Sequence, residues 1–134
     1  MNQTRSYLIF VARVLIASVF LINGFGIVSP AMAIHDMVEK GIAPHLAELL
    51  CIAGRIIDIL CGVGFIAGTY QRVCTLGLIL FLIPATLIAH SFWSAPSSIY
   101  HIQLVNFFKN LSIVGGLLLV ACNKSFGGIE KAQS

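Results

Sequence analysis

Charged side chains are scarce in this sequence: only 10% of its 134 residues are Asp, Glu, Lys or Arg, whereas 58% are apolar. Soluble domains carry about 25% charged residues, so the scarcity excludes an ordinary soluble globule, and the apolar excess excludes a disordered chain. The net charge of +3 comes from dispersed cations, and the lack of a basic cluster excludes a nucleic-acid partner. The sequence therefore predicts an integral membrane protein.

Familiar catalytic and cofactor motifs are missing as well. The sequence has no glycine-rich phosphate loop, nucleophile elbow, paired catalytic carboxylates or c-type haem motif. The histidines match no metal-ligand spacing, and Cys51, Cys61, Cys74 and Cys122 form no C-x-x-C pair. We therefore predict no metal, interpret the cysteines as small packing residues, and find no reason to expect catalysis by this chain alone.

Four long apolar segments are present instead. A membrane-spanning helix needs about 20 mostly apolar residues, and windows of that length predict spans over residues 7–28, 46–68, 73–93 and 99–122. These spans leave no room for a soluble domain, so residues 1–134 are expected to form one all-α domain, a four-helix transmembrane bundle.

The loop between the first two spans, residues 29–45, is longer than a hairpin needs. Its apolar and polar side chains alternate, and Gly41 and Pro44 follow as they do at the ends of helices. We predict a short amphipathic helix on the outer surface. A plain connector is the alternative.

Lysine and arginine are distributed unevenly between the two sides of these spans. Arg5, Arg72, Lys124 and Lys131 fall on one side, and Lys40 falls on the other. Because basic residues concentrate on the cytoplasmic side of membrane proteins, both termini and the turn at residues 69–72 are expected in the cytoplasm.

Several polar side chains nevertheless lie within or near the ends of the predicted spans. An ionisable group at the bilayer centre costs roughly 2.5–3.5 kcal/mol, so each such residue suggests a function. The candidate ligand-binding residues are Arg13, Asp58, His90, Lys109 and Asn110. The secondary candidates are Asn23, Glu48, Arg55 and Asn106.

The charges inside the spans do not balance, because Arg13, Arg55 and Lys109 face only one acid, Asp58. Burying unpaired charge costs far more than burying a pair. The cationic excess therefore predicts an anionic or electron-rich ligand, such as a quinone carbonyl or a small oxyanion. His90 is a candidate to relay protons, since imidazole changes charge near neutral pH. The alternative is a structural network in which Arg13 pairs with Asp58 and ties helices together.

Six short motifs follow one another over almost the whole chain. They are Val11–Leu15, Phe20–Gly24, Gly41–Pro44, the acid fourteen residues before Arg72 (Asp58), His90–Phe92 and Phe108–Leu111. This set resembles the DoxX family of small four-helix bacterial membrane proteins. The family usually has Glu at the position of Asp58, often Lys at that of Ile27, and a shorter G-x-P where Gly41–Pro44 stands. Arg55 is outside the family pattern.

The resemblance implies a place in the bacterial cytoplasmic (inner) membrane and an association with redox complexes. One branch of the family is similar to subunits of thiosulfate:quinone oxidoreductases, and another links oxidative-stress enzymes at the membrane. The expected function is a redox-associated subunit with an intramembrane site for a quinone-like or small anionic ligand, and quinone is the cofactor it suggests.

Two alternatives stay open. The protein is either a non-catalytic scaffold or accessory subunit of a membrane complex, or a small-anion transporter that works as an oligomer. The expected partners are the lipid bilayer, other membrane or redox proteins and, for the transporter, further copies of this chain. Whether the chain is an enzyme is left open.

Overall fold

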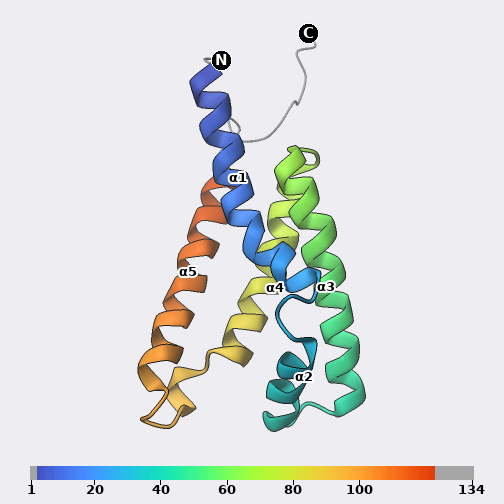
Figure 1. Ribbon diagram of the computed structural model, residues 1–134, viewed down its shortest axis with the longest axis vertical. Coiled ribbons are helices and arrows are strands. Elements are labelled where there is room, and N and C mark those ends of the chain that lie inside the picture. The colour runs from blue at the N-terminus through green and yellow to red at the C-terminus, as the bar shows by residue number, and fades with distance from the viewer. Residues whose placement is uncertain (1–2, 123–134) are drawn as a thin grey trace.

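The computed structural model describes residues 3–122, which form a bundle of helices (Figure 1). The elements in chain order are α1 (Gln3–Gly24), α2 (Pro30–Glu39), α3 (Pro44–Ala67), α4 (Gln71–Ala89), the 3-10 helix η1 (Phe92–Ser94) and α5 (Tyr100–Cys122). The described part contains no strand. Because α1, α3, α4 and α5 are long and apolar enough to cross a membrane, the predicted all-α bundle with four spanning helices is confirmed. Lys124 and Lys131, on which part of the predicted topology rests, lie outside the described residues.

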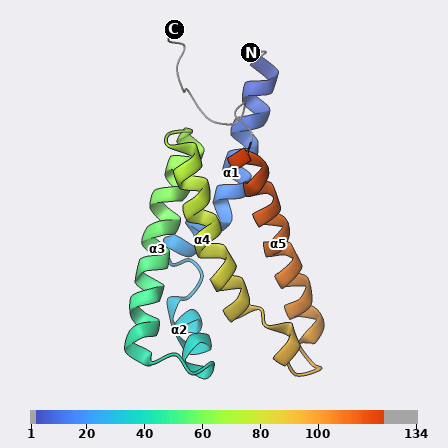
Figure 2. The ribbon, with the colours of Figure 1, turned by 180° about the vertical axis from the view of Figure 1, so that it is seen from behind.

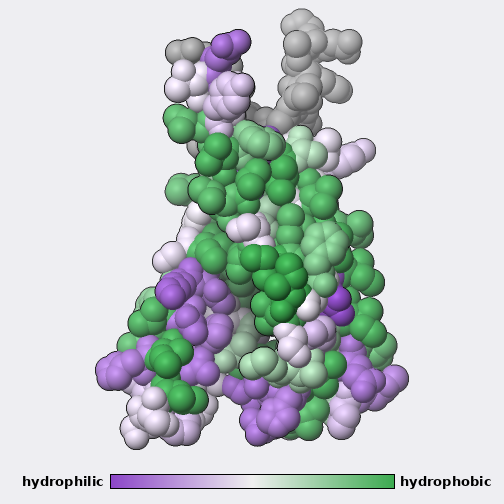
Figure 3. All heavy atoms as spheres, viewed as in Figure 1, coloured by the Kyte–Doolittle hydropathy of each residue, from purple (hydrophilic) through white to green (hydrophobic). Residues whose placement is uncertain are grey.

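The helices pack in chain order: α1 against α3, α3 against α4, and α4 against α5. The core is small and holds Phe20, Phe65, Leu78 and Leu117, all fully or almost fully buried. Most other large apolar side chains face outward, and Figure 3 shows them covering the upper and middle parts of the molecule. This distribution suits a protein whose solvent is lipid, where close packing of helices replaces a large hydrophobic core.

The first spanning helix ends earlier than the sequence indicated. The apolar run continues to Val28, but α1 stops at Gly24 and the backbone turns at Gly26, whose φ is +76°. Gly24 packs against Ile59, near the middle of α3. The remaining, N-terminal half of α3 is therefore not covered by α1.

Helix α2 takes that place. It packs against α3 and α4, and Met37 on its inner face is buried whereas His35 and Glu39 are exposed. The short amphipathic helix predicted within residues 29–45 is thus present. It lies beneath the end of α1 in Figure 1, at the same end of the bundle as η1.

Helix α5 is the least enclosed of the four spans. It packs on α4 and η1, and its N-terminal half diverges from α2, as Figures 1 and 2 both show. One face of α5 is consequently left open toward the space beside α1 and α2.

Candidate functional site

The most deeply buried charged residue is Asp58, in the middle of α3. Its exposed fraction is 0%, and its Oδ2 accepts a 2.6 Å hydrogen bond from Nδ2 of Asn23 in the last turn of α1. The other oxygen, Oδ1, is also buried and has no hydrogen-bond partner within the described part of the chain. Asn23 and Asp58 therefore join α1 to α3 at the level where α1 ends.

Arg55 lies on α3, one turn before Asp58, and caps the C-terminal end of α1. Its Nε donates a 3.0 Å hydrogen bond to the carbonyl oxygen of Gly24, and its guanidinium lies against Gly26. The last carbonyls of a helix have no donor within the helix, and a cation is favourable at that end of the helix dipole. We refer to Asn23, Gly24, Arg55 and Asp58 as the α1-end cluster.

Arg13 is not part of this cluster. It lies ten residues before Asn23, which is about 15 Å along an α-helix, and its guanidinium contacts Gly68 at the C-terminus of α3. The alternative in which Arg13 pairs with Asp58 does not describe this structure, because the register of α1 on α3 brings Asn23 opposite the carboxyl group.

Two more candidates, His90 and Asn110, join α4 to α5. Asn110 Nδ2 donates to Thr86 Oγ1 at 3.0 Å, and Thr86 Oγ1 donates in turn to the carbonyl oxygen of Leu82 at 2.7 Å. His90 Nδ1 lies 2.8 Å from Oε1 of Gln103. Thr86 and Gln103 were not among the predicted site residues, because the prediction weighted ionisable and asparagine side chains. Both are polar residues in apolar segments, and this pattern in the sequence could have identified them.

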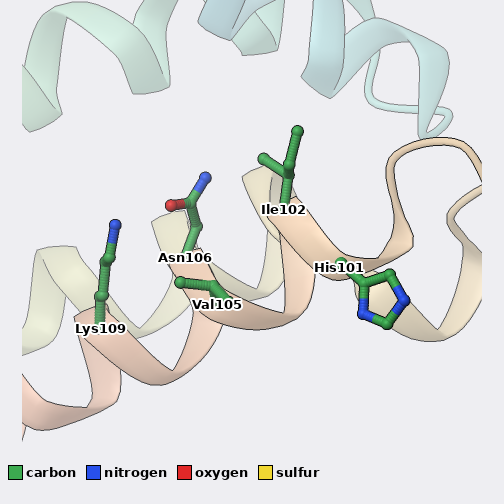
Figure 4. A pocket seen from close by; sticks show the side chains of 5 residues that line it. All are labelled: His101, Ile102, Val105, Asn106 and Lys109. Carbon is green, nitrogen blue, oxygen red and sulfur yellow. The ribbon is translucent and has the colours of Figure 1, made fainter.

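A shallow and largely open hollow of about 290 Å³ lies on one face of α5, and all of its lining residues belong to that helix. It is lined by His101, Ile102, Val105, Asn106 and Lys109, and we call it the α5 groove. In Figure 4 the side chains of Ile102, Asn106 and Lys109 extend from one side of α5 toward the ribbons of α1 and α2. Hydrophilic side chains gather over this half of α5 in Figure 3.

The structure thus divides the predicted candidates among separate places rather than one site. The α1-end cluster holds Asn23, Arg55 and Asp58, and the α4–α5 interface holds His90 and Asn110. The α5 groove holds Asn106 and Lys109. Arg13 lies at the end of α3, and Glu48 lies on the exposed surface of α3. Of these places, the α5 groove and the surface position of Glu48 present polar groups to open space, and the α5 groove is the hollowed one.

Among residues 3–122, one group of potential metal ligands occurs, and it lies on α2. Ligand atoms of His35, Asp36 and Glu39 lie within 4.8 Å of one another, and His35 Nε2 is 3.7 Å from Glu39 Oε1. His35 and Glu39 are both largely exposed, and the contact between them is the ordinary one of residues four apart on a helix surface. This surface arrangement gives no reason to assign a metal.

Comparison with known proteins agrees with this architecture. The DoxX family model matches residues 8–91, which include the α1-end cluster and His90 but not α5. Inner membrane protein YphA of Escherichia coli (strain K12) is 25% identical over 126 residues, which are 90% of this chain and 85% of that protein. No solved structure matches the chain significantly.

Proposed function

The chain belongs to the DoxX family, and we propose that it is an inner-membrane subunit that holds a quinone-like or small anionic ligand in the α5 groove. The family match covers more than half of the chain. The relative YphA is named as an inner membrane protein, which supports the proposed location in that membrane. The N-terminal end of α1 and the C-terminal end of α5 lie at one end of the bundle, together with the turn between α3 and α4 (Figure 1). With Arg5 and Arg72 at that end, we propose that it faces the cytoplasm.

The observation that carries this proposal is the position of Lys109. It is the tenth residue of α5, about 14 Å from the start of that helix, and thus near the middle of a hydrocarbon core of about 30 Å. Its ammonium group makes no hydrogen bond or ion pair with the part of the chain that the structure describes, and its side chain points into the groove (Figure 4). A cation at this depth is costly, and an anionic or electron-rich ligand would offset that cost.

The rest of the groove suits a flat ligand with few polar atoms. Asn106, one turn before Lys109, offers a second donor, while Ile102 and Val105 offer apolar contacts. The hollow of about 290 Å³ is at the lower limit of small-molecule pockets, which start at about 300 Å³. It would hold a head group, and a longer apolar tail would extend into lipid. His90 does not line the groove. We therefore propose that it holds α4 and α5 together through its contact with Gln103 and does not relay protons.

The proposal is tested by ligand-dependent thermal stability of the purified protein in lipid nanodiscs. Decylubiquinone and thiosulfate serve as the quinone and anion probes. One of them is expected to raise the unfolding temperature of the wild type, and Lys109→Met should abolish the shift. Arg72→Met removes an exposed cation at the start of α4 and should keep it. A lack of any shift, or an equal shift in Lys109→Met, would count against the groove.

A scaffold or accessory function is the second candidate, and the internal pairing of the polar residues favours it. Asp58, Arg55, His90 and Asn110 each bond to another part of the bundle. Such bonds fix which helices meet. A scaffold predicts that Lys109→Met lowers the amount of assembled complex on a native gel, with no ligand-dependent difference from the wild type.

A further inference from the structure

Helix α1 is displaced along α3 toward the end of the bundle where the α3–α4 turn lies. Asn23, in the last turn of α1, hydrogen-bonds to Asp58 in the middle of α3 at 2.6 Å, and Arg13 contacts Gly68, where α3 ends. Residues 3–12 therefore lie beyond the C-terminal end of α3, over about 15 Å of helix. Figure 1 shows the first turns of α1 extending past the turn between α3 and α4. We call residues 3–12 the α1 arm.

The rest of the bundle is long enough to cross the membrane without this arm. Helix α3 has 24 residues, which is about 35 Å of helix, whereas the hydrocarbon core of a bilayer is about 30 Å thick. The polar turn at residues 69–72, with the exposed Arg72, marks one boundary of that core near the level of Gly68. The α1 arm therefore extends beyond the hydrocarbon core.

The α1 arm is nevertheless apolar and uncovered. Within the part of the chain that the structure describes, Tyr7, Leu8, Phe10 and Val11 are 73%, 65%, 53% and 49% exposed. Lipid chains do not cover side chains that lie outside the core, and apolar side chains grouped at such a surface mark an interface with another protein. The arm thus needs a protein partner at its own level.

The outward face of α1 carries a repeat that indicates which partner fits. Leu8, Ala12, Leu15, Val19 and Ile22 follow one another at alternating steps of four and three residues, and all five are exposed. This is the spacing of the a and d positions of a coiled coil, where a β-branched residue at a and leucine at d favour two parallel strands. Val19 is at an a position, and the small Ala12 at the other lets two backbones approach closely. We call these five residues the α1 stripe.

We propose that two copies of this chain pair in parallel through the α1 stripe, so that each arm covers the other beyond the membrane core. Copies of one chain share one orientation, because the same basic residues set it, and their arms therefore lie at the same depth. The apolar stripe ends at Arg5, the next position of the repeat, where two like charges repel each other. Pairing through α1 leaves the α5 groove free and does not depend on ligand binding there.

Cysteine cross-linking in the membranes of the expressing cells tests the pairing. Full-length protein with Cys51→Ser and Cys122→Ser receives either Ala12→Cys, on the stripe, or Phe10→Cys, which lies two residues away and thus on the opposite side of the helix. A short bis-maleimide should convert most of the Ala12→Cys protein into a dimer. Phe10→Cys and the background protein without an added cysteine should stay monomeric.

The mass of the purified protein in a mild detergent gives a second measurement. The wild type should be a dimer, and Leu8→Lys, which places a charge on the stripe, should be a monomer. Phe10→Lys places the same charge on the arm but off the stripe, and should remain a dimer. Lys109→Met should also remain a dimer, which distinguishes this interface from the α5 groove.

The outcomes separate the parts of the proposal. Absence of a cross-link through Ala12→Cys would overturn the pairing, and equal cross-linking of Ala12→Cys and Phe10→Cys would overturn the stripe as its seam. A cross-link from Ala12→Cys to a different protein in place of the dimer would give the arm another partner and overturn the proposal as well. If Leu8→Lys fails to fold, or if detergent separates the copies, the cross-linking in membranes decides.

Discussion

Arg55 Nε lies 3.0 Å from the carbonyl oxygen of Gly24 and donates a hydrogen bond to it. Arg55 is at the middle of α3 (Pro44–Ala67), so α1 ends far from either end of the helix on which it packs. Backbone carbonyls that leave a helix at membrane depth need partners from the protein. The hydrogen bond from Arg55 therefore explains how the first span can stop at Gly24.

Replacing Arg55 tests this explanation. Arg55→Leu leaves the Gly24 carbonyl without its donor, and we expect a loss of about 1.5–3 kcal/mol in the free energy of unfolding, as for hydrogen bonds to charged groups. Reversible unfolding in mixed detergent micelles measures the loss. Ile56→Leu, at the exposed neighbouring position, serves as the control. Equal stabilities of Arg55→Leu and the wild type would contradict the capping role.

Asp58 is expected to tolerate loss of its charge better than loss of its hydrogen bond. Asp58→Asn keeps an oxygen that can accept from Asn23, and should change the stability by less than about 1 kcal/mol. Asp58→Leu leaves the Asn23 amide buried without a partner, which costs about 1–3 kcal/mol. The same unfolding assay compares the two variants. A loss in Asp58→Asn as large as that in Asp58→Leu would contradict this expectation and would assign the stabilisation to the carboxylate charge.

Gly77 is expected to be needed only because the sulfur of Cys61 lies against it. Gly77→Ala should destabilise the protein by about 1–3 kcal/mol through overpacking, and adding Cys61→Ala should recover most of the loss. Gly115→Ala is the matched control, since a Cβ atom there meets nothing within 4 Å and gains up to about 1 kcal/mol in helix propensity. The idea fails if Cys61→Ala gives no recovery, because the clash would then lie elsewhere.

Thr86 is expected to matter more than Thr75, although both are buried threonines of α4. Each hydroxyl donates to a carbonyl of its own helix, but only Thr86 also accepts from Asn110 of α5. Hydrogen bonds between membrane helices are worth about 0.6 kcal/mol on average, with a maximum of about 1.7. Thr86→Val should therefore lower stability by more than Thr75→Val, by about this amount. Equal effects of the two substitutions would show that the hydrogen bond from Asn110 makes no net contribution to stability.

The fold could largely be predicted from the sequence, because hydrophobic length is a local signal. Four apolar runs specified four spanning helices, and the alternation in residues 29–45 specified α2. The end of α1 was placed too late, at Val28, because Phe25 and Ile27 are as apolar as the helix before them. The helix ends because of Gly24 and Gly26 and of the donor from Arg55, which a hydropathy window does not register.

The candidate site could be predicted only as a set of residues. Burial cost identified Asp58 and Lys109 correctly as polar groups within the spans, but their partners depend on how far each helix is shifted along its neighbour. The predicted pairing of Arg13 with Asp58 assumed that the N-terminal end of the first span and the C-terminal end of the second lie at the same level, whereas Arg13 lies beside Gly68 at the C-terminus of α3. The close approach of Cys61 to Gly77 and of Cys74 to Gly64 depends on the same kind of register.

The most direct test of the proposed function is equilibrium binding of decylubiquinone and thiosulfate to the purified protein in nanodiscs, compared between the wild type, Lys109→Met and Arg72→Met. We predict saturable binding of one of these probes to the wild type and to Arg72→Met, and binding weaker by about tenfold or more in Lys109→Met, since loss of a charged hydrogen bond costs at least about 1.5 kcal/mol. Binding of equal strength in all three proteins, or saturable binding in none, would contradict the assignment of the ligand to the α5 groove.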